Sequence, residues 1–241
     1  AGMTGVGVYA SRLLRAMTEA CAASGGDDST RWILPHLPGA PLKRHAQGAD
    51  AILVETVRDY GDHPSGEWWL NVTLPRLLRR TGADLVHGPA FLIPWTPTRA
   101  KKIVTILDLV PFRHPDSFTR RYGWYMRQAI RLSARAADGV IAISQRTADD
   151  LVEIAGTPRE RIRAIPLAAD PTLEPPTPAA IEAVRRRHGL DRPYLLFVGT
   201  LEPRKNLPRT IRVLERLRDR GRDVALAVAG PSGWRPESSM R

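Results

Sequence analysis

The fold is decided by one stretch of the sequence, Tyr194-Leu195-Leu196-Phe197-Val198-Gly199-Thr200-Leu201-Glu202-Pro203-Arg204-Lys205-Asn206-Leu207. Its first five residues are apolar and stand between Pro193 and Gly199, which predicts a buried parallel strand. The helical spacing of Ile211, Leu214 and Leu217 predicts an amphipathic helix after it, with Asn206 as N-cap. A second apolar run over residues 224–228 completes a strand–helix–strand unit of the kind found in α/β domains.

Two basic residues, Arg204 and Lys205, stand between the end of that strand and the start of the helix. The helix dipole makes this an unfavourable place for cations unless an anion joins them. A bound phosphate would accept hydrogen bonds from both side chains and from free backbone N–H groups. Two solvated surface cations are the alternative. The loop has only one glycine, so it lacks the G-x-G-x-x-G dinucleotide fingerprint.

Several motifs occur in the order known for one enzyme family. They are G-T-L-E-P-R-K-N-L at 199–207, G-V-G-V-Y at 5–9, L-P-R-L-L at 74–78, A-D-L-V-H-G-P at 83–89 and D-G-V-I-A-I-S at 138–144. Together they resemble the family-four glycosyltransferases of the GT-B fold, and among these the bacterial sugar transferases, often mannosyltransferases, of surface polysaccharide synthesis. The resemblance implies that Arg204 and Lys205, with Gly199 and Thr200 beside them, bind the diphosphate of a nucleotide-sugar donor.

The resemblance also implies an α/β fold of GT-B architecture with two Rossmann-like lobes. We expect residues 1–172 to form the N-terminal, acceptor-side domain and residues 173–241 to begin the C-terminal nucleotide-sugar domain. The proline-rich segment 167–178 has the composition of a semi-rigid linker between them. By comparison with the family, the first lobe is expected to lack its initial strand and the second to be truncated, so that this chain alone would not turn over.

Candidate substrate-facing residues of the first lobe lie near its start and after a predicted strand. Gly5 and Gly7 are expected in a flexible turn before a helix over 8–22, and in the family this loop faces the substrates. A strand over 83–86 would deliver His87 to its carboxyl end, where open α/β sheets bind ligands. A hydrogen-bonded structural histidine is the alternative for His87.

The strand expected over residues 102–107 leads to Asp108, the candidate catalytic residue. In the family this segment commonly reads T-I-H-D-L, whereas here Leu107 replaces the histidine that lies beside the reacting sugar. Leucine can neither donate nor accept a hydrogen bond. Asp108 is retained and is expected to orient the acceptor, with helix capping or pairing to an arginine as its structural alternative.

A long helix is predicted over residues 118–137, with two distinct faces. The expected apolar stripe consists of Phe118, Tyr122, Tyr125, Ala129, Leu132 and Ala136. Another face can lie on an anionic membrane surface or simply face water, and it carries Arg120, Trp124, Arg127, Arg131 and Arg135. The next helix is expected to start at a Thr147 cap.

Charge and composition narrow the choice of partners. The net charge of +11 attracts nucleotide diphosphates, anionic lipids and nucleic acid alike. The positive charge is dispersed, however, and no nucleic-acid-binding signature is present, so we expect no nucleic acid partner. A single cysteine and the lack of an apolar run long enough for a membrane span favour a cytoplasmic protein. Its position would be peripheral, at the inner face of the plasma membrane, if the basic helix face binds lipid.

The leading functional hypothesis is a retaining glycosyltransferase that moves a sugar, such as mannose, from a nucleotide-sugar donor to a lipid-linked or saccharide acceptor. No clustered His, Cys or carboxylate spacing indicates a metal site, and the family usually needs no metal, so no cofactor is expected. The second hypothesis is a non-catalytic or incomplete nucleotide-sugar-binding fragment. Leu107 and the lack of the family's downstream acidic motif favour that second hypothesis.

Overall fold

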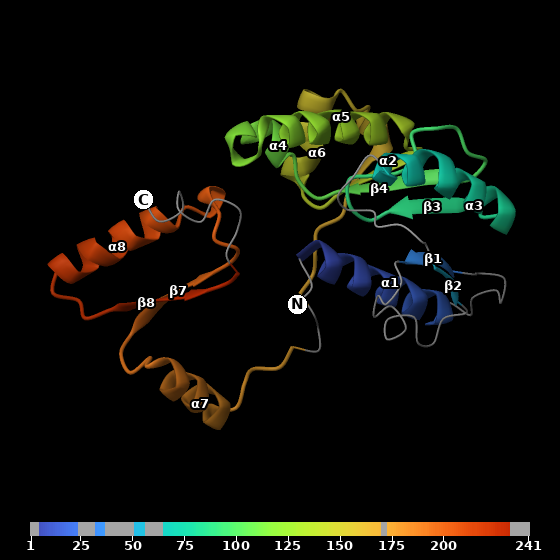
Figure 1. Ribbon diagram of the computed structural model, residues 1–241. Coiled ribbons are helices and arrows are strands. Elements are labelled where there is room, and N and C mark those ends of the chain that lie inside the picture. The colour runs from blue at the N-terminus through green and yellow to red at the C-terminus, as the bar shows by residue number, and fades with distance from the viewer. Residues whose placement is uncertain (1–4, 24–31, 37–50, 56–64, 170–172, 232–241) are drawn as a thin grey trace. The chain divides into compact units, whose positions relative to one another are not determined.

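The computed structural model describes residues 5–23, 32–36, 51–55, 65–169 and 173–231, and the chain groups into two compact units (Figure 1). The first unit comprises Ala1–Leu109 and Trp124–Leu167, and the second comprises Val110–Gly123 and Ala168–Arg241. The domain boundary expected after residue 172 is close to the end of the first unit at Leu167. That boundary would have placed Val110–Gly123 in the first domain, whereas these residues belong to the second unit.

A four-stranded parallel sheet forms the centre of the first unit. Its strands lie side by side in the order β3 (Leu85–Gly88), β4 (Lys101–Ile106), β5 (Gly139–Ala142) and β6 (Ile162–Ala164). Because all four are parallel, their carboxyl ends share one edge of the sheet and their amino ends share the other. A separate parallel pair consists of β1 (Trp32–His36) and β2 (Ala51–Glu55).

Helices precede or connect these strands. They are α1 (Gly5–Ala23), α2 (Ser65–Trp68), a π-helix (Trp69–Thr73), α3 (Leu74–Thr81), α4 (Val110–Arg113), a 3-10 turn (Pro115–Ser117), α5 (Arg120–Ala136), α6 (Gln145–Ala155) and a second 3-10 turn (Arg159–Arg161). The prediction that Thr147 caps α6 is wrong. Ser144 is the N-cap, and its Oγ accepts a hydrogen bond from the Thr147 N–H at 3.1 Å. Ser144 takes this role because its extended backbone leads directly from β5 into the helix.

The core of the first unit is built by β4, β5, α5 and α6. Their best-buried large apolar residues, each at most 1% exposed, are Val104, Ile106, Ile130, Val140 and Leu151. These residues come from the short apolar runs that predicted the strands, and from the helices that follow them. Because these residues are tightly packed, the strands are held in place, and the polar residues at both edges of the sheet lie outside the core.

Helix α5 buries a different face from the one that we predicted. Tyr122 is 51% exposed and Leu132 is 40% exposed, so the predicted stripe is wrong at these two large residues, whereas its Ala129 is fully buried. The face that is buried contains mostly small residues: Gly123, Met126, Ala129, Ile130, Ser133, Ala134 and Ala137. Small side chains let a helix approach its neighbours closely, and a pattern of large apolar residues misses them.

The second unit contains the strand–helix–strand unit that the sequence predicted. It consists of α7 (Pro178–His188), β7 (Tyr194–Val198), a 3-10 turn (Pro203–Lys205), α8 (Leu207–Asp219) and β8 (Ala225–Ala229), with β7 and β8 paired in parallel. The expectation of a buried strand is wrong for β7, since Leu196 is 60% exposed and Val198 is 71% exposed. Helix α8 packs on this pair of strands through Leu207 and Leu214, and among the described residues no element covers the face of β7 that carries Leu196 and Val198.

Candidate functional site

The carboxyl edge of the four-stranded sheet brings together three side chains from three elements. Nε2 of His87 on β3 lies 2.9 Å from Oγ1 of Thr105 on β4. The hydroxyl of Tyr9 on α1 donates a hydrogen bond to the same Oγ1 atom at 3.2 Å. Thr105 is fully buried. One buried hydroxyl therefore joins the first turns of α1 to the end of β3.

Burial sets the charge of His87. Desolvation lowers the pKa of His87 below its ordinary value of 6.5, because a buried imidazolium loses its hydration. The ring is therefore neutral at pH 7, with one nitrogen that donates and one that accepts. A neutral imidazole of this kind can bind a sugar hydroxyl, whereas its bond to Thr105 also fits the structural alternative. The structure places His87 inside β3 and not beyond its end.

The backbone after β3 turns back sharply, one residue beyond His87. A Cβ on Gly88 would lie only 2.1 Å from the carbonyl oxygen of Leu92 and 2.6 Å from Cγ2 of Ile93, so only glycine fits there. Phe91 adopts a φ of 64°, and its N–H donates to the carbonyl oxygen of Thr105 at 2.9 Å. The loop after β3 therefore folds back tightly against the strand end.

Gly5 and Gly7 lie in the first turns of α1, so the loop that we expected for them is wrong. The helix begins three residues earlier than its apolar residues suggested. The first four N–H groups of a helix need no intrahelical acceptor, and this start tolerates the glycines. The expectation that Gly5 and Gly7 lie near the substrates stays a prediction. Tyr9, two residues after Gly7, reaches the carboxyl edge of the sheet through Thr105.

Leu107 and Asp108 follow β4 directly and are half-buried. They therefore leave the sheet at the same edge at which Thr105 meets His87. The catalytic role expected for Asp108 stays a prediction.

The second unit holds the predicted donor loop, between β7 and α8. Gly199 adopts a φ of 149°, and its N–H donates to the carbonyl oxygen of Ala229 at 2.9 Å. A Cβ on Gly230 would lie 1.9 Å from the carbonyl oxygen of Gly199, so the ends of β7 and β8 are in close backbone contact. The side chain of Lys205 folds back to this point, since its Cε and Cδ lie 3.8 and 3.9 Å from the Cβ position of Gly199.

The two cations of the donor loop have different surroundings. Nη2 of Arg204 forms an ion pair with Oε1 of Glu202 in the same loop. The side chain of Lys205 has no hydrogen-bond or ion-pair partner among the described residues, and the same holds for Thr200. Lys205 is therefore available to an anion as the loop stands, whereas Arg204 would first have to share or leave Glu202. In the sequence, the signal for this ion pair was Glu202, which stands two positions before Arg204.

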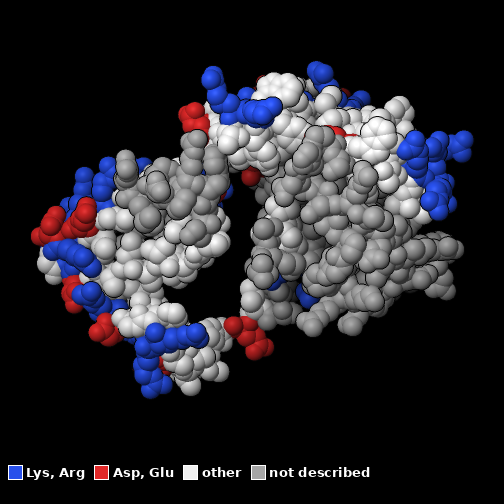
Figure 2. All heavy atoms as spheres, viewed as in Figure 1, with Lys and Arg blue, Asp and Glu red and all other residues white. Residues whose placement is uncertain are grey.

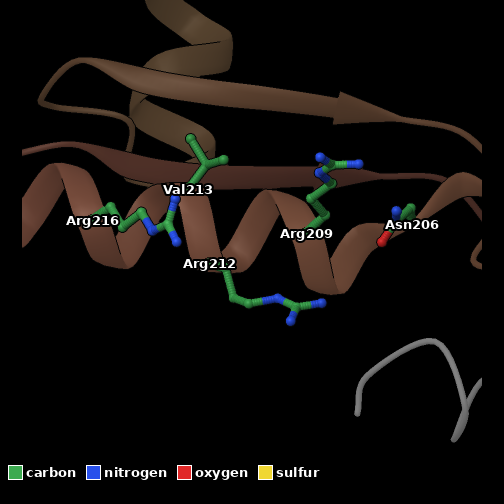
Figure 3. Close-up of a pocket in the computed structure, with 5 residues that line it drawn as sticks. All are labelled: Asn206, Arg209, Arg212, Val213 and Arg216. Carbon is green, nitrogen blue, oxygen red and sulfur yellow. The ribbon is translucent and has the colours of Figure 1, made fainter.

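Three more arginines follow the donor loop along α8. Arg209, Arg212 and Arg216 line a hollow of about 350 Å³ together with Asn206 and Val213 (Figure 3). Asn206 occupies the predicted N-cap position in a left-handed conformation, with a φ of 56°, but its side chain makes no capping hydrogen bond. The amino end of α8 therefore has no side-chain cap and is surrounded by basic side chains.

The described part of the chain lacks two further features. None of its helices combines the length and apolar character needed to cross a bilayer. Within the same residues, no three His, Cys, Asp or Glu side chains gather closely enough to hold a metal ion.

The chain belongs to glycosyltransferase family 4, whose family model matches residues 3–173. It is 26% identical to the O-antigen chain mannosyltransferase B of Escherichia coli over 76% of this chain and 46% of that protein. It is 27% identical to the alpha-D-kanosaminyltransferase of Streptomyces kanamyceticus over 93% of this chain and 64% of that protein. It is 30% identical to the 2-deoxystreptamine glucosyltransferase of the same organism, over 70% and 48% respectively. The chain thus spans between 46% and 64% of the length of these relatives.

A solved structure shows the same fold. HepE of Anabaena, crystallised in complex with UDP and glucose, matches with a TM-score of 0.55 at 18% identity over 82% of this chain and 52% of that one. At this identity the likeness concerns the fold alone. Together with the parallel sheets described above, it confirms the expected α/β fold class of the GT-B glycosyltransferases.

Sequence reasoning missed Tyr9 and Thr105 as members of the site. Both stand inside motifs that we quoted, but neither residue type by itself indicates a function. The available signal was the place of Thr105 in the otherwise apolar run 103–107, because a buried hydroxyl needs a hydrogen-bond partner.

Proposed function

We propose that this protein transfers a sugar from a nucleotide-sugar donor to a saccharide or lipid-linked acceptor, with retention of the anomeric configuration. The observation that carries the proposal is the donor loop, in which Lys205 folds over Gly199 beside Thr200 at the start of α8. The names of the three relatives support it, because they differ in the sugar but share glycosyl transfer. UDP and glucose in the HepE crystal support a nucleotide-sugar donor.

The proposed roles follow from where charge develops in the reaction. As the bond between the sugar and the diphosphate breaks, negative charge builds up on the leaving diphosphate. The ammonium group of Lys205 and the uncapped amino end of α8 would stabilise that charge, and Arg204 would join them by exchanging Glu202 for phosphate. Asp108 would accept a hydrogen bond from the acceptor hydroxyl, and neutral His87 would bind a sugar hydroxyl.

The test is the binding of nucleoside diphosphates to a Lys205→Ala variant. A charge-assisted hydrogen bond contributes about 1.5–3 kcal/mol, so we expect the affinity for the preferred diphosphate to fall roughly tenfold or more. Calorimetry with UDP and with GDP measures this fall. The matched control is Arg220→Ala, which removes a cation at the other end of α8. An unchanged affinity in Lys205→Ala, or an equal loss in the control, would remove the donor loop from the proposal.

The donor sugar is the finer part of the proposal, and we propose mannose as the first candidate because one relative is a mannosyltransferase. Leu107 would shape this choice, since it replaces the hydrogen-bonding histidine of the family motif with an apolar side chain. Calorimetric binding of a panel of nucleotide-sugars to the wild type and to Leu107→His measures it. The same sugar preference in both proteins would show that Leu107 has no part in the selection.

A further inference from the structure

A basic hollow lies at the amino edge of the four-stranded sheet, opposite the edge that carries His87 and Thr105. It encloses about 420 Å³, and the charged residues that line it are Arg99, Lys101, Lys102, Arg135, Asp138 and Arg161. They come from four segments: the start of β4, the last turn of α5, the turn before β5 and the turn before β6. Figure 2 shows Lys and Arg side chains at the end of the first unit where α3 ends, and the last turn of α3 itself carries Arg79 and Arg80.

The charges in this hollow are unbalanced. Five cationic side chains face a single carboxylate, that of Asp138. Asp138 is already engaged, because Oδ1 accepts from Nζ of Lys101 at 3.0 Å and Oδ2 accepts from the backbone N–H of Lys102 at 2.9 Å. These bonds hold the pKa of Asp138 below its ordinary value, so the carboxylate stays ionised and fixed.

The remaining cations have no such partner. The side chains of Arg99, Arg135 and Arg161 are exposed and make no hydrogen bond or ion pair with any described residue. Lys102 is only 9% exposed, and its Nζ reaches two carbonyl oxygens, those of Pro94 and Thr96, at 3.4 Å each. Bringing these cations together costs free energy because they repel one another. A bound anion would attract them and make the electrostatic energy of the hollow favourable.

We propose that this hollow is a second anion site, separate from the donor loop, which binds a phosphate group carried by a small molecule or by a lipid headgroup. Guanidinium groups suit this chemistry because their planar donors match the oxygen atoms of phosphate in pairs. Arg99, Arg135 and Arg161 would supply those donors, while Lys101 and Lys102 add charge from the side of Asp138. All of these residues lie in the first unit, so the site needs no part of the second.

The experiment is a calorimetric titration of inorganic pyrophosphate into the full chain, made also in a Lys205→Ala background to remove the proposed donor site. We expect a binding event that survives Lys205→Ala and weakens about tenfold or more in Arg135→Gln/Arg161→Gln. The matched control, Arg186→Gln/Arg187→Gln in α7, makes the same change in net charge and should stay within about twofold. Arg99→Gln is a second, independent variant with the same expectation as the Arg135 and Arg161 pair.

Flotation with vesicles separates the two sources of phosphate. Vesicles of phosphatidylcholine with phosphatidic acid present the group on a lipid, and pure phosphatidylcholine vesicles are the blank. Loss of pyrophosphate binding with unchanged vesicle binding identifies a soluble ligand, and loss of vesicle binding, with or without loss of pyrophosphate binding, identifies a headgroup. The proposal is overturned if neither ligand responds to the hollow variants, or if the α7 control responds as strongly. Lys205 belongs only to the donor loop. A failure of the second anion site would therefore leave the proposed function unaffected, and a failure of the donor loop would leave the second anion site unaffected.

Discussion

Replacing Thr105 by valine should destabilise the first unit by about 2 kcal/mol. The hydroxyl of Thr105 makes two side-chain hydrogen bonds, at 2.9 Å to His87 and at 3.2 Å to Tyr9, and each contributes about 1 kcal/mol net. Valine replaces the hydroxyl with a methyl group of similar size, so the cost comes mainly from the two lost hydrogen bonds and from the partners left unpaired. His87 and Tyr9 are half-buried, and partial access to water limits the penalty for leaving them without a partner.

Urea unfolding followed by tryptophan fluorescence measures this cost. Five of the six tryptophans belong to the first unit, which lets its transition be read separately from that of the second. Tyr9→Phe should cost about 1 kcal/mol in the wild type and almost nothing in the Thr105→Val background, because its partner is already gone. The reasoning is refuted if Thr105→Val unfolds at the wild-type urea concentration, or if the two substitutions are additive.

Protonation of His87 should destabilise the protein: its folded pKa lies below 6.5, so the unfolded state binds more protons and stability falls as the pH drops below that value. Thermal unfolding between pH 7.5 and 5.5 should show a shallower fall for His87→Gln than for the wild type, and equal slopes in the two proteins would contradict this expectation. Gly88→Ala should destabilise the protein by about 3 kcal/mol, because its Cβ would collide with the backbone of the following loop. The control is Gly139→Ala, whose Cβ meets nothing within 4 Å. In the same urea assay, this control should change the free energy of unfolding by less than about 0.5 kcal/mol. If the basic face of α5 binds anionic membranes, Trp124→Ala should reduce recovery with anionic vesicles at low salt, since Trp124 is 61% exposed; equal recovery would exclude this residue from membrane contact.

The strands and helices were predictable because their signals are local. Short apolar runs predicted β4 and β7 to within one residue, and the order of the motifs indicated the family to which the chain belongs. The contact between Lys205 and Gly199 is local as well, because the two residues are only six positions apart and a turn suffices to bring them together. The donor-binding role of this loop stays a prediction.

What the sequence by itself determined, then, is the fold class, the family and the stretch that holds Lys205. Only the tertiary structure decided which side chains meet across long separations. Tyr9 and Thr105 are 96 residues apart in the chain, and the basic hollow draws on residues from 99 to 161. It also decided which face of α5 is buried, because small residues pack there and large aromatic ones do not. Local patterns depend on spacing along the backbone, whereas these contacts depend on how separate elements pack against the sheet.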